Sequence, residues 1–129
     1  MIVGIGVDLV KIERIARLLD RYGKRLADKI LSPAEMPLFA KTKNPTAMLA
    51  KRFAAKEAVA KALGTGMRGG VYFPQIEITN KPSGAPVVLL GGKARERAEK
   101  LRVKSTHVSI SDEEDFVVAF AVMETNESG

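Results

Sequence analysis

The sequence predicts an α+β fold, a single domain in which a mostly antiparallel sheet packs against a long central helix. Three observations favour it. Extended apolar segments lie near both ends of the chain, an alanine-rich helical stretch lies between them, and 129 residues suffice for one hydrophobic core. Several strands are expected in one sheet, with the helices on one of its faces. The domain is expected to span residues 1–124, with 125–129 as a frayed tail.

The first strand is expected over residues 2–10, where apolar and β-branched residues surround two glycines, and we interpret it as buried. Because side chains alternate along a strand, Gly4, Gly6 and Asp8 share one face. Asp8 therefore projects from a strip with almost no side-chain bulk.

The pattern becomes helical from about residue 11 to residue 22. Its apolar positions predict an inward face formed by Ile12, Ile15, Leu19 and Tyr22. The opposite side carries a row of arginines, Arg14, Arg17, Arg21 and Arg25. We expect this helix to present a basic surface to solvent.

Capping signals divide the middle of the chain. Ser32 and Glu35 form a capping box with Pro33 at the first helical position, so a short second helix is expected there. Residues 44–46 interrupt the chain again and start the alanine-rich helix, which ends at the glycines of 64–66.

The second half of the chain alternates between extended segments and turns. Extended segments are expected at residues 71–73, 75–79 and 87–90. Residues 80–86 form a tight connection, and a polar helix is expected over 93–102. Residues 106–111 and 116–123 predict a hairpin across the acidic turn 112–115.

Composition narrows the class of protein. The formal net charge of +6 favours an anionic partner, whereas five Phe, two Tyr and no Trp offer little for single-stranded nucleic acid to stack on. Cysteine is absent, which excludes disulfides and thiolate metal sites. We find neither a signal peptide nor a membrane span in the sequence, and we expect a cytoplasmic protein.

The central helix carries the most informative pattern. Leu49, Phe53, Glu57 and Lys61 lie four residues apart, so an apolar stripe continues directly into a carboxylate and an ammonium group. An exposed Glu–Lys pair at this spacing would be only a weak helix stabiliser, worth about 0.2–0.5 kcal/mol. At the inward end of an apolar stripe, however, charged groups need partners. The alanines around them also leave room for a ligand.

Polar groups elsewhere join this pair. Asp8 ends the first strand, and His107, the only histidine, shares a strand face with Ser109 and Ser111. Taken singly, Asp8 could cap the following helix, His107 could be structural, and the serines could simply face solvent. Together, two carboxylates without His or Cys neighbours suit a Mg²⁺ ion that is also held by substrate phosphate. A lysine and a histidine nearby would suit a phosphoryl or pyrophosphate group.

These motifs resemble those of bacterial holo-acyl-carrier-protein synthases, the short-chain group of 4′-phosphopantetheinyl transferases. The first is Gly-Ile-Gly-Val-Asp-Leu-Val at 4–10, followed by Arg14, and the second is Arg-Phe-Ala-Ala-Lys-Glu-Ala at 52–58, followed by Lys61 and Gly-Thr-Gly at 64–66. Asn80, the Gly-Ala-Pro of 84–86 and His-Val-Ser-Ile-Ser at 107–111 complete the pattern. The resemblance covers nearly the whole chain, in the family's order.

The resemblance implies a reaction in fatty acid biosynthesis. These enzymes transfer 4′-phosphopantetheine from coenzyme A to a serine hydroxyl of apo acyl carrier protein, releasing holo acyl carrier protein and adenosine 3′,5′-bisphosphate. By the resemblance, Asp8 and Glu57 would hold Mg²⁺ against the pyrophosphate, and Lys61 would neutralise its charge and assist the leaving group. Whether Glu57, Asp8 or a metal-bound water is the base stays open.

The resemblance also implies contacts to the nucleotide and an oligomer. Members of this group assemble as homotrimers with active sites between subunits, so some contacts would come from a neighbour. The residues matching positions that bind coenzyme A are Arg52, Gly64, Asn80, Gly84, Pro86, His107 and, more weakly, Ser109.

The family docks the acidic acyl carrier protein on the basic first helix. Arg14, Arg21 and Arg25 are the candidate contacts, with Leu18 as an apolar anchor, although exposed arginines often have no such role. We expect neither nucleic acid nor a membrane as a partner.

Two alternatives remain. A non-catalytic basic module could bind nucleic acid, but it would leave Asp8 and Glu57 unexplained because carboxylates repel phosphates. A relative that binds coenzyme A without transferring phosphopantetheine is the other.

Overall fold

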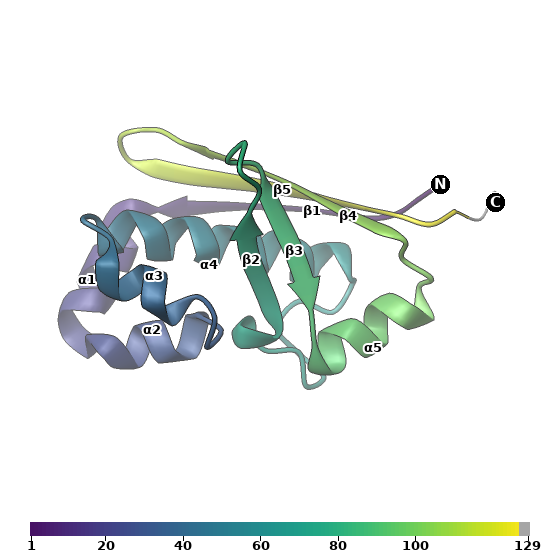
Figure 1. The fold of residues 1–129 in the computed structure, drawn as a ribbon, viewed down its shortest axis with the longest axis horizontal. Helices are drawn as coiled ribbons and strands as arrows, with labels where there is room; N and C mark the ends of the chain where they lie inside the picture. Colours follow the sequence, from purple (N-terminus) through teal and green to yellow (C-terminus); the bar gives the residue numbers. More distant parts are fainter. Residues whose placement is uncertain (127–129) are drawn as a thin grey trace.

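Two antiparallel sheets surround one long helix in the computed structural model, which describes residues 1–126 (Figure 1). In chain order the elements are β1 (Ile2–Lys11), α1 (Ile12–Tyr22), α2 (Lys24–Ile30), α3 (Met36–Lys41), α4 (Pro45–Ala62), the 3₁₀ helix η1 (Phe73–Gln75), β2 (Ile76–Asn80), β3 (Pro86–Leu90), α5 (Gly92–Lys100), β4 (Ser105–Asp112) and β5 (Phe116–Glu124).

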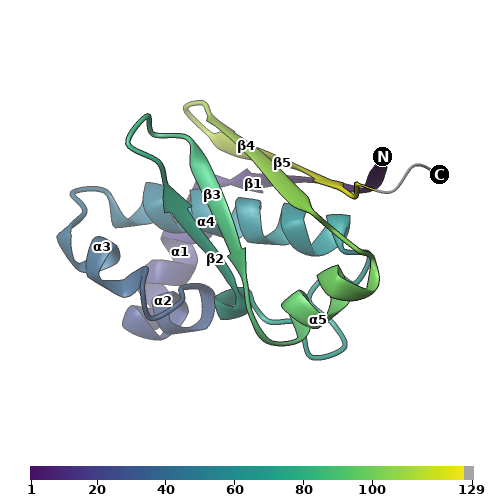
Figure 2. The same ribbon diagram turned by 45° about the vertical axis from the view of Figure 1, so that its right-hand side comes forward.

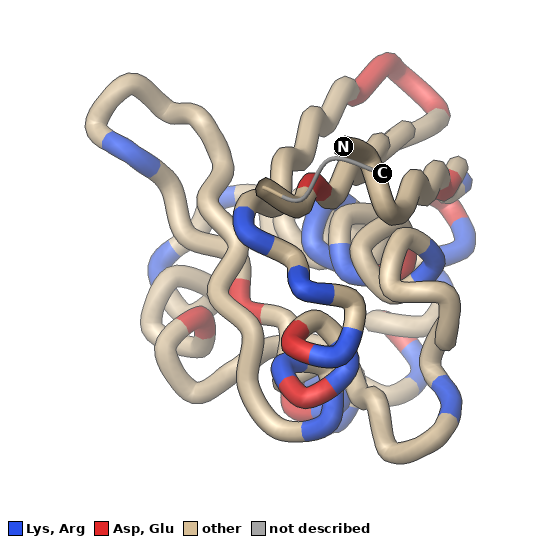
Figure 3. The backbone as a smooth tube through the Cα atoms, turned by 90° about the vertical axis from the view of Figure 1, so that its right-hand side faces the viewer, with Lys and Arg blue, Asp and Glu red and all other residues tan. Residues whose placement is uncertain are grey.

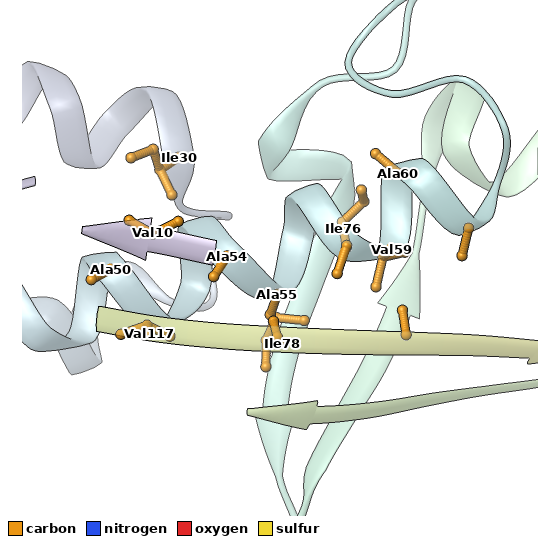
Figure 4. Close-up of a cluster of buried hydrophobic side chains, with 14 of the residues drawn as sticks. Val10, Ile30, Ala50, Ala54, Ala55, Val59, Ala60, Ile76, Ile78 and Val117 are labelled. Carbon is orange, nitrogen blue, oxygen red and sulfur yellow. The ribbon is translucent and has the colours of Figure 1, made fainter. Parts of the chain in front are cut away.

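The strands form two sheets rather than the single one expected from the sequence. One has the order β1-β5-β4, and the other is the β2–β3 hairpin. The three-stranded sheet covers one side of α4, while Ile76 and Ile78 of the hairpin are buried near Ala55 and Val59 of the same helix (Figure 4). Each sheet therefore buries one face on α4. The hairpin crosses the helix, and its strand β3 lies beside β4 (Figure 2). The α+β class with a long central helix is confirmed.

Two glycines let β1 approach α4 unusually closely. A Cβ atom at Gly4 would lie 1.9 Å from the carbonyl oxygen of Ala62, and one at Gly6 would lie 1.9 Å from that of Ala58. The expected common face of Gly4, Gly6 and Asp8 is therefore the face that packs on the helix. The strand is not buried on both faces, however. The apolar side chains of its other face are exposed: Ile5, Val7 and Leu9.

The basic helix α1 ends before the last of the four arginines that were expected along it. It ends at Tyr22, because Gly23 adopts a positive φ of 56°, and α2, which we did not anticipate, starts at Lys24. Arg25 therefore lies on α2. Tyr22 was expected to face inward but is 38% exposed, with the guanidinium groups of Arg21 and Arg25 over its ring at 5.3 and 5.6 Å.

Capping follows the sequence only in part. The helix α4 starts within residues 44–46 as expected, and Asn44 caps it by accepting a hydrogen bond from the Ala47 amide at 3.0 Å. At the expected capping box, the Ser32 amide donates to Glu35 Oε1 at 2.7 Å, but the Ser32 hydroxyl donates to Glu77, and α3 begins only at Met36. Residues 71 and 72 form no strand.

Glu35 and Lys56 form a buried ion pair at the centre of the molecule. Both side chains are almost fully buried, and Lys56 Nζ lies 2.6 Å from Glu35 Oε1 and donates to the Ile30 carbonyl at 2.6 Å. Glu35 Oε2 accepts from the Ile78 amide at 3.0 Å and from Arg52 Nε at 3.3 Å. Burial lowers the pKa of Lys56, and the hydrogen bond to Glu35 opposes that shift. The pair joins α2, the turn before α3, α4 and β2.

The two ends of the described chain lie together. The Thr125 amide donates to the Met1 carbonyl at 2.9 Å, and the Met1 ammonium donates to the Thr125 carbonyl at 3.0 Å. Thr125 is therefore hydrogen-bonded to the first residue of the chain, and residues 127–129 of the expected frayed tail lie outside the described residues. Within residues 1–126, every helix is too short or too polar to span a bilayer.

Replacing Lys56 by Met should lower the free energy of unfolding by about 3–5 kcal/mol, because it leaves the buried Glu35 carboxylate without its closest partner. Lys51→Met is the matched control on the same helix, since the Lys51–Asp112 pair is partly exposed and 3.6 Å long. It should cost less than about 1 kcal/mol. Urea unfolding at one fixed protein concentration measures both, and equal effects of the two substitutions would contradict the central role of the pair.

Candidate active site

Asp8, Glu57 and Lys61 come together where β1 lies on α4. Lys61 Nζ donates to Asp8 Oδ1 at 3.1 Å and to the Val7 carbonyl at 2.9 Å. Along α4, Leu49 is fully buried, Phe53 and Glu57 are partly buried and Lys61 is exposed, so the stripe seen in the sequence emerges from the core at this point. The expected grouping of the three residues is present in the structure.

Asp8 has an unsatisfied oxygen. Its Oδ2 atom is buried and has no hydrogen-bond partner among the described residues, whereas Oδ1 accepts from Lys61. A buried carboxylate oxygen without a donor is costly unless a ligand or ion satisfies it.

Glu57 is the second carboxylate of the site. Burial raises its pKa, the Asp8 charge raises it further, and Lys61 and Arg14 oppose the shift. A cation would favour the charged form of both carboxylates, and their oxygens are ligands that suit Mg²⁺. Residues 1–126 contain no cluster of three or more possible metal ligands. A cation held here would therefore need substrate or water oxygens as well.

A hollow of about 530 Å³ opens beside these groups. It is lined by Glu57, Lys61 and the loop that follows α4, Gly64, Thr65, Gly66, Met67 and Arg68. Gly64 and Gly66 have positive φ angles of 81° and 60°, which turn the chain sharply at the helix end. Of the residues matched to coenzyme A contacts, Gly64 is the one that lines this hollow.

A second hollow, of about 420 Å³, lies between α1, α2 and α4. Arg14, Leu18 and Arg25 of the expected docking set line it, and its apolar wall includes Phe53 and Phe73, whose rings stack at 5.2 Å. The fourth member, Arg21, lies over the ring of Tyr22, which also lines the hollow. We call this hollow the basic groove. Arg14 borders the groove, and its positive charge also opposes the rise in the pKa of Glu57. The groove therefore lies close to the carboxylates.

Other candidate contacts lie elsewhere. Arg52 and Asn80 line a third hollow of about 580 Å³. The Arg52 guanidinium is already engaged, since it pairs with Glu35 and donates to the Ile78 carbonyl at 3.4 Å. Asn80 donates to the Gly84 carbonyl at 2.9 Å across the hairpin loop, and Pro86 begins β3.

His107 and Ser109 lie on the outer face of the three-stranded sheet, away from α4. The register places His107 beside Val122 and Ser109 beside Phe120, on the same side as Ile5 and Val7, whereas Asp8 is beside the buried Ala119 on the other side. His107 Nε2 lies 2.6 Å from Glu124 Oε1. One chain therefore does not bring His107 to Asp8 and Glu57.

Sequence reasoning missed the roles of Glu35 and Lys56. Lys56 precedes Glu57 in the second motif, yet it lies seven residues after Leu49 and three before Val59, at an apolar position of the helix. A lysine at such a position, with alanines before and after it, could have signalled a buried ion pair. Nothing local identified Glu35 as its partner, because the two lie 21 residues apart.

Comparisons with known proteins cover nearly the whole chain. The model of the 4′-phosphopantetheinyl transferase superfamily matches residues 4–121. The holo-[acyl-carrier-protein] synthase of Maridesulfovibrio salexigens is 49% identical over 124 residues, which are 96% of this chain and 99% of the relative.

Solved structures agree. That of the holo-[acyl-carrier-protein] synthase from Neisseria meningitidis has a TM-score of 0.91 and 45% identity, covering 97% of this chain and 100% of that one. The enzyme from Helicobacter pylori, in complex with coenzyme A, has a TM-score of 0.81 and 32% identity, covering 93% and 99%. The chain therefore belongs to the 4′-phosphopantetheinyl transferase superfamily and, within it, to the holo-[acyl-carrier-protein] synthases.

Proposed function

We propose that Asp8, Glu57 and Lys61 catalyse transfer of 4′-phosphopantetheine from coenzyme A to a serine hydroxyl of apo acyl carrier protein. The observation that carries this assignment is the pair of adjacent carboxylates, one with an unsatisfied buried oxygen, beside a lysine and an open hollow. A cytoplasmic location and a role in fatty acid biosynthesis stay predictions from the sequence.

Asp8 and Glu57 would hold a Mg²⁺ ion with oxygen atoms only. Bound there, Mg²⁺ would stabilise charge on the pyrophosphate oxygens of coenzyme A. Lys61 lies on the same side, so its ammonium group can neutralise charge on the phosphate that leaves.

Glu57 has the properties of a general base. Its carboxylate lines the open hollow beside Lys61, where an acceptor hydroxyl could reach it. It would take the serine proton directly or through a water, while the serine oxygen bonds to the phosphorus that bears the pantetheine group. The bond from that phosphorus to the bridging oxygen breaks, and adenosine 3′,5′-bisphosphate leaves with the electron pair.

Asp8→Asn and Glu57→Gln should each lower the rate of transfer about 100-fold or more, because several kcal/mol of charge stabilisation is lost. The measurement is intact-mass spectrometry of an apo acyl carrier protein incubated with coenzyme A and Mg²⁺. The wild type should add one phosphopantetheine, and EDTA should abolish the gain. Glu99→Gln, an exposed carboxylate on α5, is the control. Normal transfer by either site variant would remove that residue from the mechanism.

The basic groove fits an acidic acyl carrier protein. It combines cationic residues at its edge with an apolar floor, which suits an acidic helix carrying an apolar side chain. Its proximity to Glu57 would bring the acceptor serine to the carboxylates.

Arg25→Glu should raise the KM for acyl carrier protein about ten-fold and leave the KM for coenzyme A unchanged, because like charges then oppose docking. Arg95→Glu makes the same charge change on exposed α5 and serves as the control. The difference between the two should shrink as salt is added. Equal effects of both substitutions would move the docking site elsewhere.

The outer face of the three-stranded sheet would be the contact surface of a homotrimer. Exposed apolar residues from β1 and β5 cover it: Ile5, Val7, Leu9, Phe116, Val118 and Phe120. Such a patch is unusual on a protein that functions as a monomer. His107 and Ser109 lie on the same face, so a neighbouring chain packed there could place them at another subunit's carboxylates.

Light scattering of the wild type should give three times the 14.0 kDa mass of one chain. Phe120→Asp should give a lower mass and lose transfer, because it buries a charge in the contact. Leu89→Asp, at an exposed leucine of β3, is the control and should leave the mass unchanged. A wild-type monomer or dimer with full activity would contradict the proposal.

A further inference from the structure

The loop after α4 is a thin wall between two hollows. Thr65 lines the hollow that contains Glu57 and Lys61, and it also lines a smaller one of about 220 Å³ against α5. The loop's Thr65 and Gly66 amides both donate to the Ala60 carbonyl, at 3.3 and 3.0 Å. These bonds fix the start of the loop, but they do not hold it on the side that faces α5.

Arg97 of α5 supplies that support. Its Nε donates to the Leu63 carbonyl at 2.8 Å, just past the end of α4, where carbonyl groups lack helical partners. Its Nη2 lies 3.3 Å from the position that a Cβ atom of Gly64 would take. The side chain is partly buried, unlike that of Arg95 on the same helix, which is 69% exposed and lies 3.9 Å from Glu99.

The far end of the same segment is also fastened to α5. Gln75 donates through Nε2 to the Gly70 carbonyl at 2.9 Å, and its Oε1 accepts from the Ala94 amide at 3.1 Å. Charged residues of both signs lie along α5 (Figure 3). Among them, Arg97 donates a hydrogen bond from its guanidinium to the loop. Residues 63–70 are therefore held on α5 at both ends, through Arg97 at one end and through Gln75 at the other.

We propose that Arg97 is a positioning residue: by holding the Leu63 carbonyl and packing on Gly64, it fixes the wall of the hollow beside Glu57 and Lys61 and thereby sets the affinity for coenzyme A. This rests on the proposed function, because the hollow is taken as the coenzyme A site. Arg97 touches neither the reacting atoms nor the groove expected to bind the carrier protein.

The test compares Arg97→Met with Arg95→Met in steady-state kinetics. Arg97→Met should raise the KM for coenzyme A about five- to ten-fold, the scale of one typical hydrogen bond, with kcat and the KM for acyl carrier protein within two-fold of wild type. Arg95→Met should match the wild type. Arg97→Lys keeps a donor for the Leu63 carbonyl and should restore most of the affinity.

Hydrogen exchange provides a readout independent of transfer. The Thr65 and Gly66 amides should exchange faster in Arg97→Met than in Arg95→Met, while amides in the middle of α4 stay protected. Unchanged exchange, or an equal rise in KM for both substrates, would overturn the inference. If the wild type transfers no phosphopantetheine, the proposed function fails, and the exchange comparison still decides whether Arg97 positions the loop.

Discussion

The buried pair of Glu35 and Lys56 is the interaction on which the arrangement of the other elements depends. Glu35 receives the Lys56 ammonium, the Arg52 guanidinium and the Ile78 amide, and Lys56 also binds the last carbonyl of α2. Three parts of the chain that are far apart in the sequence, residues 30–35, α4 and β2, meet on these two side chains. With that side of α4 committed to structure, the neighbouring face can carry Glu57 and Lys61 toward β1, where a ligand can reach them.

Much of the fold follows from local patterns. The glycine strip of β1, the start of α4 at residues 44–46 and the glycines after α4 could be predicted from the sequence, because each follows from short-range rules of backbone geometry. The separate α2, the exposed outer face of β1 and the division into two sheets were not. They depend on which surfaces meet in space, and an apolar strand face reads the same whether the chain itself or another molecule covers it.

The candidate site, like the fold, was predictable from the sequence only in part. Asp8, Glu57 and Lys61 were identifiable because their spacing on a strand and a helix gives each a defined direction. His107 was correctly placed on a strand face with Ser109, but periodicity alone could not tell that this face points away from Asp8. Arg52 was matched by motif to a nucleotide contact, while its ion pair with Glu35 appears only in three dimensions.

The contact between β1 and α4 has a further consequence for the chemistry. With no side chain at Gly4 or Gly6, the strand rests almost directly on the carbonyl oxygens of Ala62 and Ala58. The spacing between the backbones that carry Asp8 and Glu57 is thus limited by hard-core repulsion, which rises steeply over tenths of an ångström, rather than by flexible side chains between them. The distance between these two backbones should therefore change little with temperature or with substitutions elsewhere in the core.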